Sequence, residues 1–257
     1  MSSKLVSGRI HTDTGALSLL ITNYAFSLIT LLLINKYHVN IIRLVLTTGL
    51  VILNIASLVR AHLGLISRRG LSDYLLFLIN TAPYLLLIPY LGIWVVIPLI
   101  PLALFMAEVM RGRGRSVMAN VSGTALIAST YLAWYTLMGG ILINLFVAVS
   151  IVWVTYHAFS ALYVESKLPF RRGIKPYHSS MLWFISLPAL AYGLYITSGT
   201  LSLVVLIEPS LRALIAIKED KLSMGDLRRR IREIGIGLLI ESLVLATLVL
   251  ILIYALA

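Results

Sequence analysis

Two long apolar runs toward the C-terminal end of the sequence contain ionisable side chains. Glu208 and Arg212 are four residues apart in the run 200–217, and Glu241 lies in the run 232–256. Side chains four apart share one helix face, so Glu208 and Arg212 can pair. Charge inside an apolar run is costly in lipid and marks proton relays and substrate sites by default. The trio therefore predicts a ligand-binding or ion-relay site, with a purely structural staple between two helices as the alternative.

Pro209 follows Glu208 directly and supports the same site. Its nitrogen cannot donate to the carbonyl of Val205, so we expect a kink and a free backbone acceptor beside Glu208. At about 1.5 Å per residue, Glu241 lies roughly 13 Å from the inner end of its run, and Arg212 reaches about the same depth. Broken helices at mid-membrane are where transporters hold ions and substrates.

Two further polar residues are candidates for ligand contact or ion relay. His157 shares helical spacing with Trp153 and Ser160, and it can relay protons, contact a ligand or hydrogen-bond to a neighbouring helix. The other histidines fall in loops or at the ends of runs, so no haem is predicted, and no other cofactor or metal is expected. Asn120 lies among small residues that predict a closely packed central helix, and we expect it to donate into a cavity.

These residues require helices that cross a membrane. Of the 257 residues, 60% are apolar and only 12% are charged, about half the charged fraction of a soluble domain. A helix needs about 20 apolar residues to cross roughly 30 Å of hydrocarbon. The sequence predicts a single all-α transmembrane domain of nine spans, near residues 15–35, 40–60, 72–91, 93–110, 117–138, 141–165, 179–198, 200–217 and 232–256.

Basic residues predict the orientation of these spans. With residues 1–14 as a cytoplasmic tail, all but three of the lysines and arginines lie in the inner segments. Lys36 and Arg43 fall on the other side and Arg212 within a span. Such bias in short loops places the N-terminus inside and the C-terminus outside, in a multi-pass protein of the plasma membrane. The inner-side residues are Lys4, Arg9, Arg60, Arg68, Arg69, Arg111, Arg113, Arg115, Lys167, Arg171, Arg172, Lys175, Lys218, Lys221, Arg228, Arg229, Arg230 and Arg232.

The same placement accounts for the net charge of +11. Each basic residue near the anionic inner leaflet contributes on the order of 1 kcal/mol of attraction to membrane lipids, which are the predicted partners. The basic faces lack the aromatic residues of a nucleic-acid groove, so no nucleic acid is expected. Arg60, Arg111 and Arg172 form a predicted inner-face basic rim, and the Arg111–Arg115 and Arg228–Arg232 clusters can also hold a phosphate.

Several catalytic classes have no support in the sequence. There are no cysteines, which excludes disulfides, thiolate metal sites and a cysteine nucleophile. None of the nucleotide-binding, zinc-hydrolase or serine-hydrolase motifs occurs. No catalytic residue is assigned, and an enzyme is not the favoured interpretation.

Several segments resemble the YwiC-like membrane proteins, a family without an assigned biochemical activity. The opening Asp13–Leu17 is similar to that family's acidic-His-Gly-Ala-Trp start, but has Thr14 for the histidine and Leu17 for the tryptophan. The resemblance implies a multi-span integral membrane protein. Its other segments run from Glu108 through Asn120 and Gly123 to Tyr131, Leu132 and Ala133, from His157 to Val164, and from Arg232 to Gly235 leading to Glu241.

Nine helices with an inner N-terminus are also similar to the UbiA-type prenyltransferases. Those enzymes hold Mg²⁺ and a prenyl diphosphate with Asp-rich motifs, and the corresponding segments 54–62 and 157–167 contain no Asp. Four functions therefore stay open. The favoured one is binding of a lipid or small ligand in a cavity lined by spans five, six, eight and nine. The others are a proton-coupled or small-solute transporter using the Glu208, Arg212 and Glu241 cluster, a UbiA-like lipid-modifying enzyme, and an accessory subunit held by protein partners.

Overall fold

The computed structural model describes residues 14–34, 39–67 and 70–256, except for the side chain of Val59. All regular secondary structure in these residues is helical. The elements are α1 (Thr14–Ile34), α2 (Ile41–Ser67), α3 (Leu71–Thr81), the 3₁₀ helix η1 (Ala82–Leu87), α4 (Ile88–Leu91), η2 (Gly92–Val95), α5 (Val96–Met110), α6 (Val117–Ala128), α7 (Thr130–Leu137), α8 (Asn144–Lys167), α9 (Pro176–Ser198), η3 (Thr200–Leu206), α10 (Ile207–Ile217) and α11 (Leu227–Leu256).

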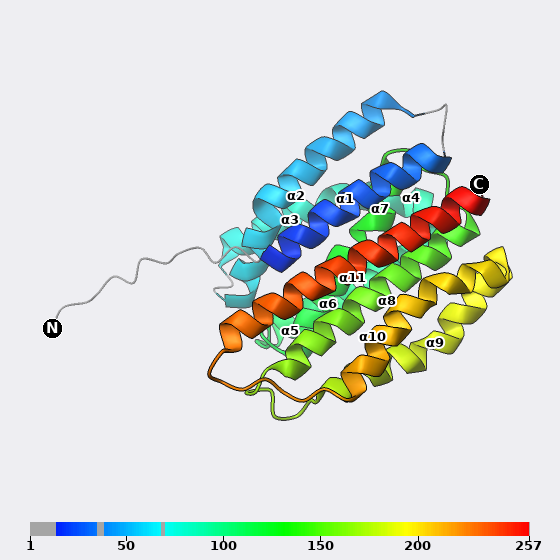
Figure 1. Cartoon of the computed structure of the whole chain (residues 1–257). Helices are drawn as coiled ribbons and strands as arrows, with labels where there is room; N and C mark the ends of the chain where they lie inside the picture. Colours follow the sequence, from blue (N-terminus) through cyan, green and yellow to red (C-terminus); the bar gives the residue numbers. More distant parts are fainter. Residues whose placement is uncertain (1–13, 35–38, 68–69, 257) are drawn as a thin grey trace.

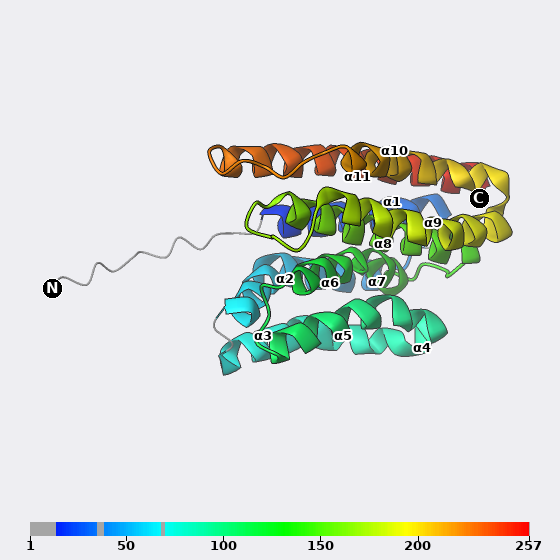
Figure 2. The same ribbon diagram turned by 90° about the horizontal axis from the view of Figure 1, so that it is seen from below.

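The helices lie along one common direction in a layered bundle (Figure 1). Figure 2 shows α10 and α11 in one outer layer, and α3, α4 and α5 in the opposite outer layer. The connections α5–α6, α8–α9 and α10–α11 meet at one end of the bundle, and α11 finishes at the other end (Figure 1). We call the end with these three connections the basic end, because Arg111, Arg113, Arg115, Arg171, Arg172, Lys175, Lys218 and Lys221 lie in them.

Seven stretches of the described residues are long and apolar enough to cross a membrane. They are Thr14–Ile34, Ile41–Ser67, Leu71–Met110, Asn144–Lys167, Pro176–Ser198, Thr200–Ile217 and Leu227–Leu256. Large apolar side chains face outward, such as Ile41 and Ile42 at 72% and 73% exposure, whereas Asn23, Asn54 and other polar side chains are buried. This inverted distribution matches lipid as the surrounding solvent and is that of a multi-pass membrane protein.

Two features account for the difference between these seven stretches and the nine predicted spans. The stretch Leu71–Met110 is 40 residues long, but Gly92 has a φ of +54°, and Figure 2 shows the chain reversing its direction between α4 and α5. The rings of Phe77 and Phe105 are 6.1 Å apart, although a straight helix would separate them by about 42 Å. The predicted span 117–138 is interrupted at Ser129, so neither α6 nor α7 alone reaches spanning length.

The interruption at Ser129 lies in the centre of the bundle, against α1 and α8. The Asn23 amide donates to the carbonyl of Ile127 at 2.7 Å, and the Trp153 indole donates to the Asn23 side-chain oxygen at 2.9 Å. The first bond gives the Ile127 carbonyl at the helix interruption a hydrogen-bond donor. An unpaired backbone carbonyl in the apolar core would be costly. The ring of Phe26 stacks on Tyr131 at 4.1 Å and completes this layer. The small residues of α6 are buried as the sequence predicts for a central packing helix: Ala119, Ser122, Gly123 and Ala125.

Candidate functional site

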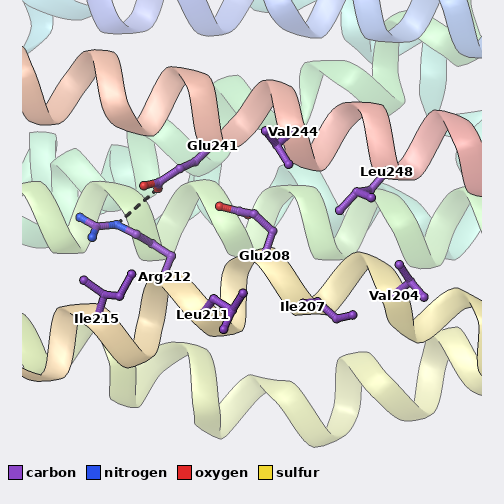
Figure 3. Close-up of a pocket in the computed structure, with 9 residues that line it drawn as sticks. All are labelled: Val204, Ile207, Glu208, Leu211, Arg212, Ile215, Glu241, Val244 and Leu248. Carbon is purple, nitrogen blue, oxygen red and sulfur yellow. Dashed lines mark ion pairs between the residues drawn. The ribbon is translucent and has the colours of Figure 1, made fainter.

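An open groove of about 400 Å³ lies between the η3–α10 segment and α11. Its lining combines the three predicted charged residues with six apolar ones. Figure 3 shows Glu208 and Arg212 pointing from α10 toward α11, and Glu241 pointing back toward α10. The lining residues are Val204, Ile207, Glu208, Leu211, Arg212, Ile215, Glu241, Val244 and Leu248.

Exposed apolar side chains surround the mouth of this groove. Ile207, Leu211 and Val244 in its lining are 54%, 55% and 45% exposed. A groove with such a mouth can take an apolar chain directly from the bilayer. Fewer segments line the groove than the sequence predicts. The predicted spans eight and nine contribute residues, and the predicted spans five and six contribute none.

Arg212 is the centre of the charged cluster. Its Nε lies 3.3 Å from Glu241 Oε2, the contact that their predicted equal depth implies. Its Nη1 lies 3.5 Å from Glu219 Oε1, and its guanidinium lies 4.1 Å from the ring centroid of Tyr163. The Arg212 side chain is 12% exposed. The guanidinium is therefore fixed between two carboxylates and an aromatic face.

Glu219 is a member of this cluster that the sequence reasoning missed. It follows α10 in the connection to α11 and accepts a hydrogen bond from the Tyr163 hydroxyl, and Lys167 Nζ lies 3.3 Å away. Burial raises the pKa of Glu219, but the Tyr163 hydrogen bond and the charges of Arg212 and Lys167 outweigh it and hold this pKa below its ordinary value. The available signal was its position seven residues after Arg212, a spacing of two helical turns.

Glu208 does not pair with Arg212, which corrects the predicted i,i+4 ion pair. The described residues contain no ion pair to Glu208, and its Oε2 is buried without a hydrogen bond. Pro209 lies in the first turn of α10, just after the chain changes from 3₁₀ to α geometry at Ile207. A proline is tolerated there because the first-turn nitrogens have no intrahelical partner.

Behind the groove, α8 presents more polar atoms without partners. The Tyr156 hydroxyl is buried with no hydrogen bond of standard geometry, and it lies close enough to Glu208 and Glu241 to interact with their charges. Ser160 Oγ and His157 Nε2 are also buried without a hydrogen bond among the described residues. His157 packs against Trp153 and Tyr156, with ring centroids 4.5 and 5.3 Å apart. It is thus on the Tyr156 side of the site but is not a lining residue.

Asn120 lies elsewhere, in a polar network at the basic end. Its amide donates to Glu165 Oε1 at 2.6 Å rather than into a cavity, and Arg171 Nε lies 2.7 Å from Glu165 Oε2. Arg171 also donates to the carbonyl of Arg115 at 2.7 Å. Together these contacts connect α6, α8 and two of the three connections.

The three residues of the predicted basic rim are not among those that line the cavity at the basic end. Arg60 and Arg172 are exposed, and Arg111 lies 3.5 Å from Glu108 with its side chain 65% exposed. The cavity at this end, of about 550 Å³, is lined instead by Ile66, Ser67, Gly112, Arg113, Arg115 and Ser116. Arg113 forms an ion pair with Glu108, with 2.7 Å between Arg113 Nη2 and Glu108 Oε1. In the part of the chain that the structure describes, no group of three His, Cys, Asp or Glu residues could hold a metal ion.

Of the opening Asp13–Leu17, Asp13 lies outside the described residues, and Thr14 begins α1. Comparison of the chain with protein-family models, with curated proteins and with solved structures gave no match. The function therefore has to be argued from the groove and its charges.

Proposed function

We propose that this protein crosses the plasma membrane nine times, with its N-terminus inside, and binds an amphiphilic ligand from the bilayer in the groove between α10 and α11. The reversal at Gly92 and the joint length of α6 and α7 support nine spans. The basic residues at one end support an inner location for that end. Membership of the YwiC-like family stays a prediction.

The observation that carries the binding proposal is the composition of the groove. An apolar trough that opens toward lipid suits an acyl or other apolar chain, while Glu208, Arg212 and Glu241 suit a polar head. A purely structural staple would place α11 directly against α10 and pair each charge. Instead a groove of about 400 Å³ lies between the two helices beside the Arg212–Glu241 pair, and Glu208 has no ion-pair partner among the described residues.

Native mass spectrometry of the gently extracted protein tests this proposal. Leu211 lines the groove and is 55% exposed, whereas Leu214, on the same helix, is 51% exposed and is not among the lining residues. Leu211→Trp fills the groove, so we expect it to lose the bound amphiphile. Leu214→Trp adds the same bulk outside the groove and should keep the ligand. Retention of the same bound mass by both variants contradicts the proposal.

A carrier for protons or a small solute, using the same residues, is the second candidate. The unpaired carboxylate oxygen of Glu208 favours it, because proton relays and transporters use buried carboxylates of this kind. This alternative predicts that Glu208→Gln abolishes flux in proteoliposomes while the melting temperature stays unchanged. A fully active Glu208→Gln protein refutes it.

An inner-leaflet enzyme has less support. The cavity at the basic end has no carboxylate among its lining residues, and Arg60, Arg111 and Arg172 do not line it. A diphosphate-dependent reaction needs clustered carboxylates for Mg²⁺.

A further inference from the structure

The charges around the groove are not balanced. On its inner side Arg212 is shared between Glu241 and Glu219, and Lys167 supplies a second positive charge to Glu219. Three carboxylates therefore surround two bases. Glu219 and Glu241 each have a basic partner, whereas the structure gives none to Glu208 among the residues that it describes.

The imbalance is localised at Glu208, whose surroundings are apolar. Ile207, Leu211 and Leu248 line the groove around it. The Glu241 carboxylate lies close enough to repel a charge on Glu208. A carboxylate without an ion pair in such a place is unfavourable unless it is protonated or meets a cation.

A second buried polar group lies at the same place. The Tyr156 side chain is fully buried behind the groove, and its hydroxyl has no hydrogen bond of standard geometry. Buried hydroxyls are nearly always hydrogen-bonded in native proteins. The Tyr156 hydroxyl has Ser160 and Glu241 as polar neighbours, so the polar side of the groove extends from Glu208 to Tyr156.

We propose that the groove selects amphiphiles with a monovalent organic cation as the head, such as an amine or an onium group, and that binding displaces one proton from Glu208. This inference rests on the proposed function and specifies its ligand. In the empty groove the Glu208 carboxyl keeps its proton. The cation then forms an ion pair with the carboxylate, the O–H bond of Glu208 breaks, and the proton leaves to solvent. The apolar body lies along Leu211, Val244 and Leu248.

The groups that face Glu208 set the pH dependence of this exchange. They are Arg212 from α10, Glu241 from α11 and Tyr156 from α8. Arg212 is held by Glu241 at 3.3 Å and by Glu219 at 3.5 Å, so it is neutralised before the ligand arrives. Cation binding should therefore strengthen as pH rises and Glu208 loses its proton more easily.

A matched pair of probes tests the sign of the charge. Tetraphenylphosphonium and tetraphenylborate have nearly the same shape and opposite charges, so a merely apolar groove would bind both. We expect the purified protein in neutral detergent micelles to bind the cation and not the anion in isothermal titration calorimetry. In weakly buffered solution, a pH indicator should report about one proton released per bound cation.

Two variants separate the possible outcomes. Glu208→Gln keeps the shape and should weaken cation binding about 10- to 100-fold, the loss expected for a charge-assisted contact, and should abolish proton release. Glu233 is an exposed carboxylate at the start of α11, with its side chain 47% exposed. The control variant Glu233→Gln should bind the cation as tightly as the unmodified protein does.

Other results overturn the inference. Equal binding of both probes, blocked by Leu211→Trp, refutes the cationic head and leaves the proposed binding function intact. Binding of neither probe, together with a co-purified neutral or anionic lipid that Leu211→Trp removes, does the same. Binding of neither probe and no ligand sensitive to Leu211→Trp refutes both. Cation binding that is unchanged in Glu208→Gln refutes the role of Glu208.

Discussion

Removal of the Glu165 carboxylate should strongly destabilise the basic end of the bundle. Glu165 is 10% exposed, accepts from Asn120 at 2.6 Å and pairs with Arg171 at 2.7 Å. In Glu165→Ala both partners lose their acceptor. Breaking one side of a buried, hydrogen-bonded ion pair costs about 3–5 kcal/mol. Because the Arg171 side chain is 24% exposed and can turn toward water, we take the lower end, about 3 kcal/mol.

Thermal unfolding in detergent, followed by circular dichroism at about 222 nm, measures this effect. A chain of this size shifts its Tm by about 2–4 °C per kcal/mol, so Glu165→Ala should lower the Tm by about 6–12 °C. The matched control is Glu233→Ala, which removes an exposed i,i+4 pair with Arg229 at 2.9 Å. Such surface pairs contribute at most about 1 kcal/mol, and the control should shift the Tm by less than about 4 °C.

The combination with Arg171→Ala provides a further check. Because Glu165 and Arg171 act on each other, the double variant should lose less stability than the sum of the two single variants. A Glu165→Ala protein that melts within the range of Glu233→Ala would refute the view that this network holds the connections in place.

Two more predictions depend on particular contacts, and a third depends on the predicted orientation in the membrane. In Gly140→Ala the new Cβ would lie 2.3 Å from the ring of Tyr135, which is fully buried and has its ring centroid 3.9 Å from that of Phe146. This overpacking should lower the free energy of unfolding by about 1–3 kcal/mol in thermal unfolding. Gly193→Ala, whose new Cβ has no atom within 4 Å, should leave the Tm unchanged or higher, and equal Tm values for the two variants would contradict the packing. Because the pKa of Glu219 is lowered in the fold, its ionised form stabilises the fold at pH values above the ordinary glutamate pKa, and this stabilisation is lost as the pH falls through the lowered pKa. Glu219→Gln should therefore flatten the acid side of a plot of stability against pH. An unchanged plot would show that the contacts of Glu219 are not formed. Since the chain has no cysteine, single cysteines report topology: in right-side-out vesicles an impermeant maleimide should label Ser198→Cys and not Gly173→Cys, and the reverse pattern would contradict the orientation.

The sequence predicts the helical bundle well because its main determinant is the length of apolar runs, which depends only on local composition. The difference between nine predicted spans and seven continuous stretches comes from Gly92 and Ser129, where the chain turns or breaks inside apolar sequence. Hydropathy does not distinguish a reversal in a long run from a straight helix. At Gly92 the positive φ marks the change, whereas Ser129 keeps a right-handed helical backbone with φ −66° and ψ −14° and neither its conformation nor polarity marks the interruption strongly.

The candidate site was only partly predictable. The depth of Arg212 and Glu241 follows from residue counting, and their contact at 3.3 Å agrees with it. The spacing of Glu208 and Arg212 indicates a shared face but not the direction in which the long arginine side chain extends. Arg212 turns instead toward Glu219, which is held in place because Lys167 donates to the carbonyl of Asp220 at 2.6 Å. Such loop positions depend on long-range contacts that no local pattern contains.

Asn120 illustrates the same limit. Its place on a helix of small residues indicates a packing position, and its side chain is half-buried, but its partner Glu165 lies 45 residues away in the sequence. In the sequence, Glu165 is a single carboxylate close to several basic residues. In the structure one of these residues, Arg171, pairs with Glu165 and helps to fix its position. A polar residue at a predicted helix interface thus indicates that a partner exists without identifying it.

The most direct test of the account is cryo-electron microscopy of the protein in lipid nanodiscs. The account predicts an elongated non-protein density in the groove between α10 and α11, with its polar end at Glu208 and its body along Leu211, Val244 and Leu248 (Figure 3). Direct packing of α10 against α11, with the groove closed and Glu208 paired to a protein side chain, would contradict it.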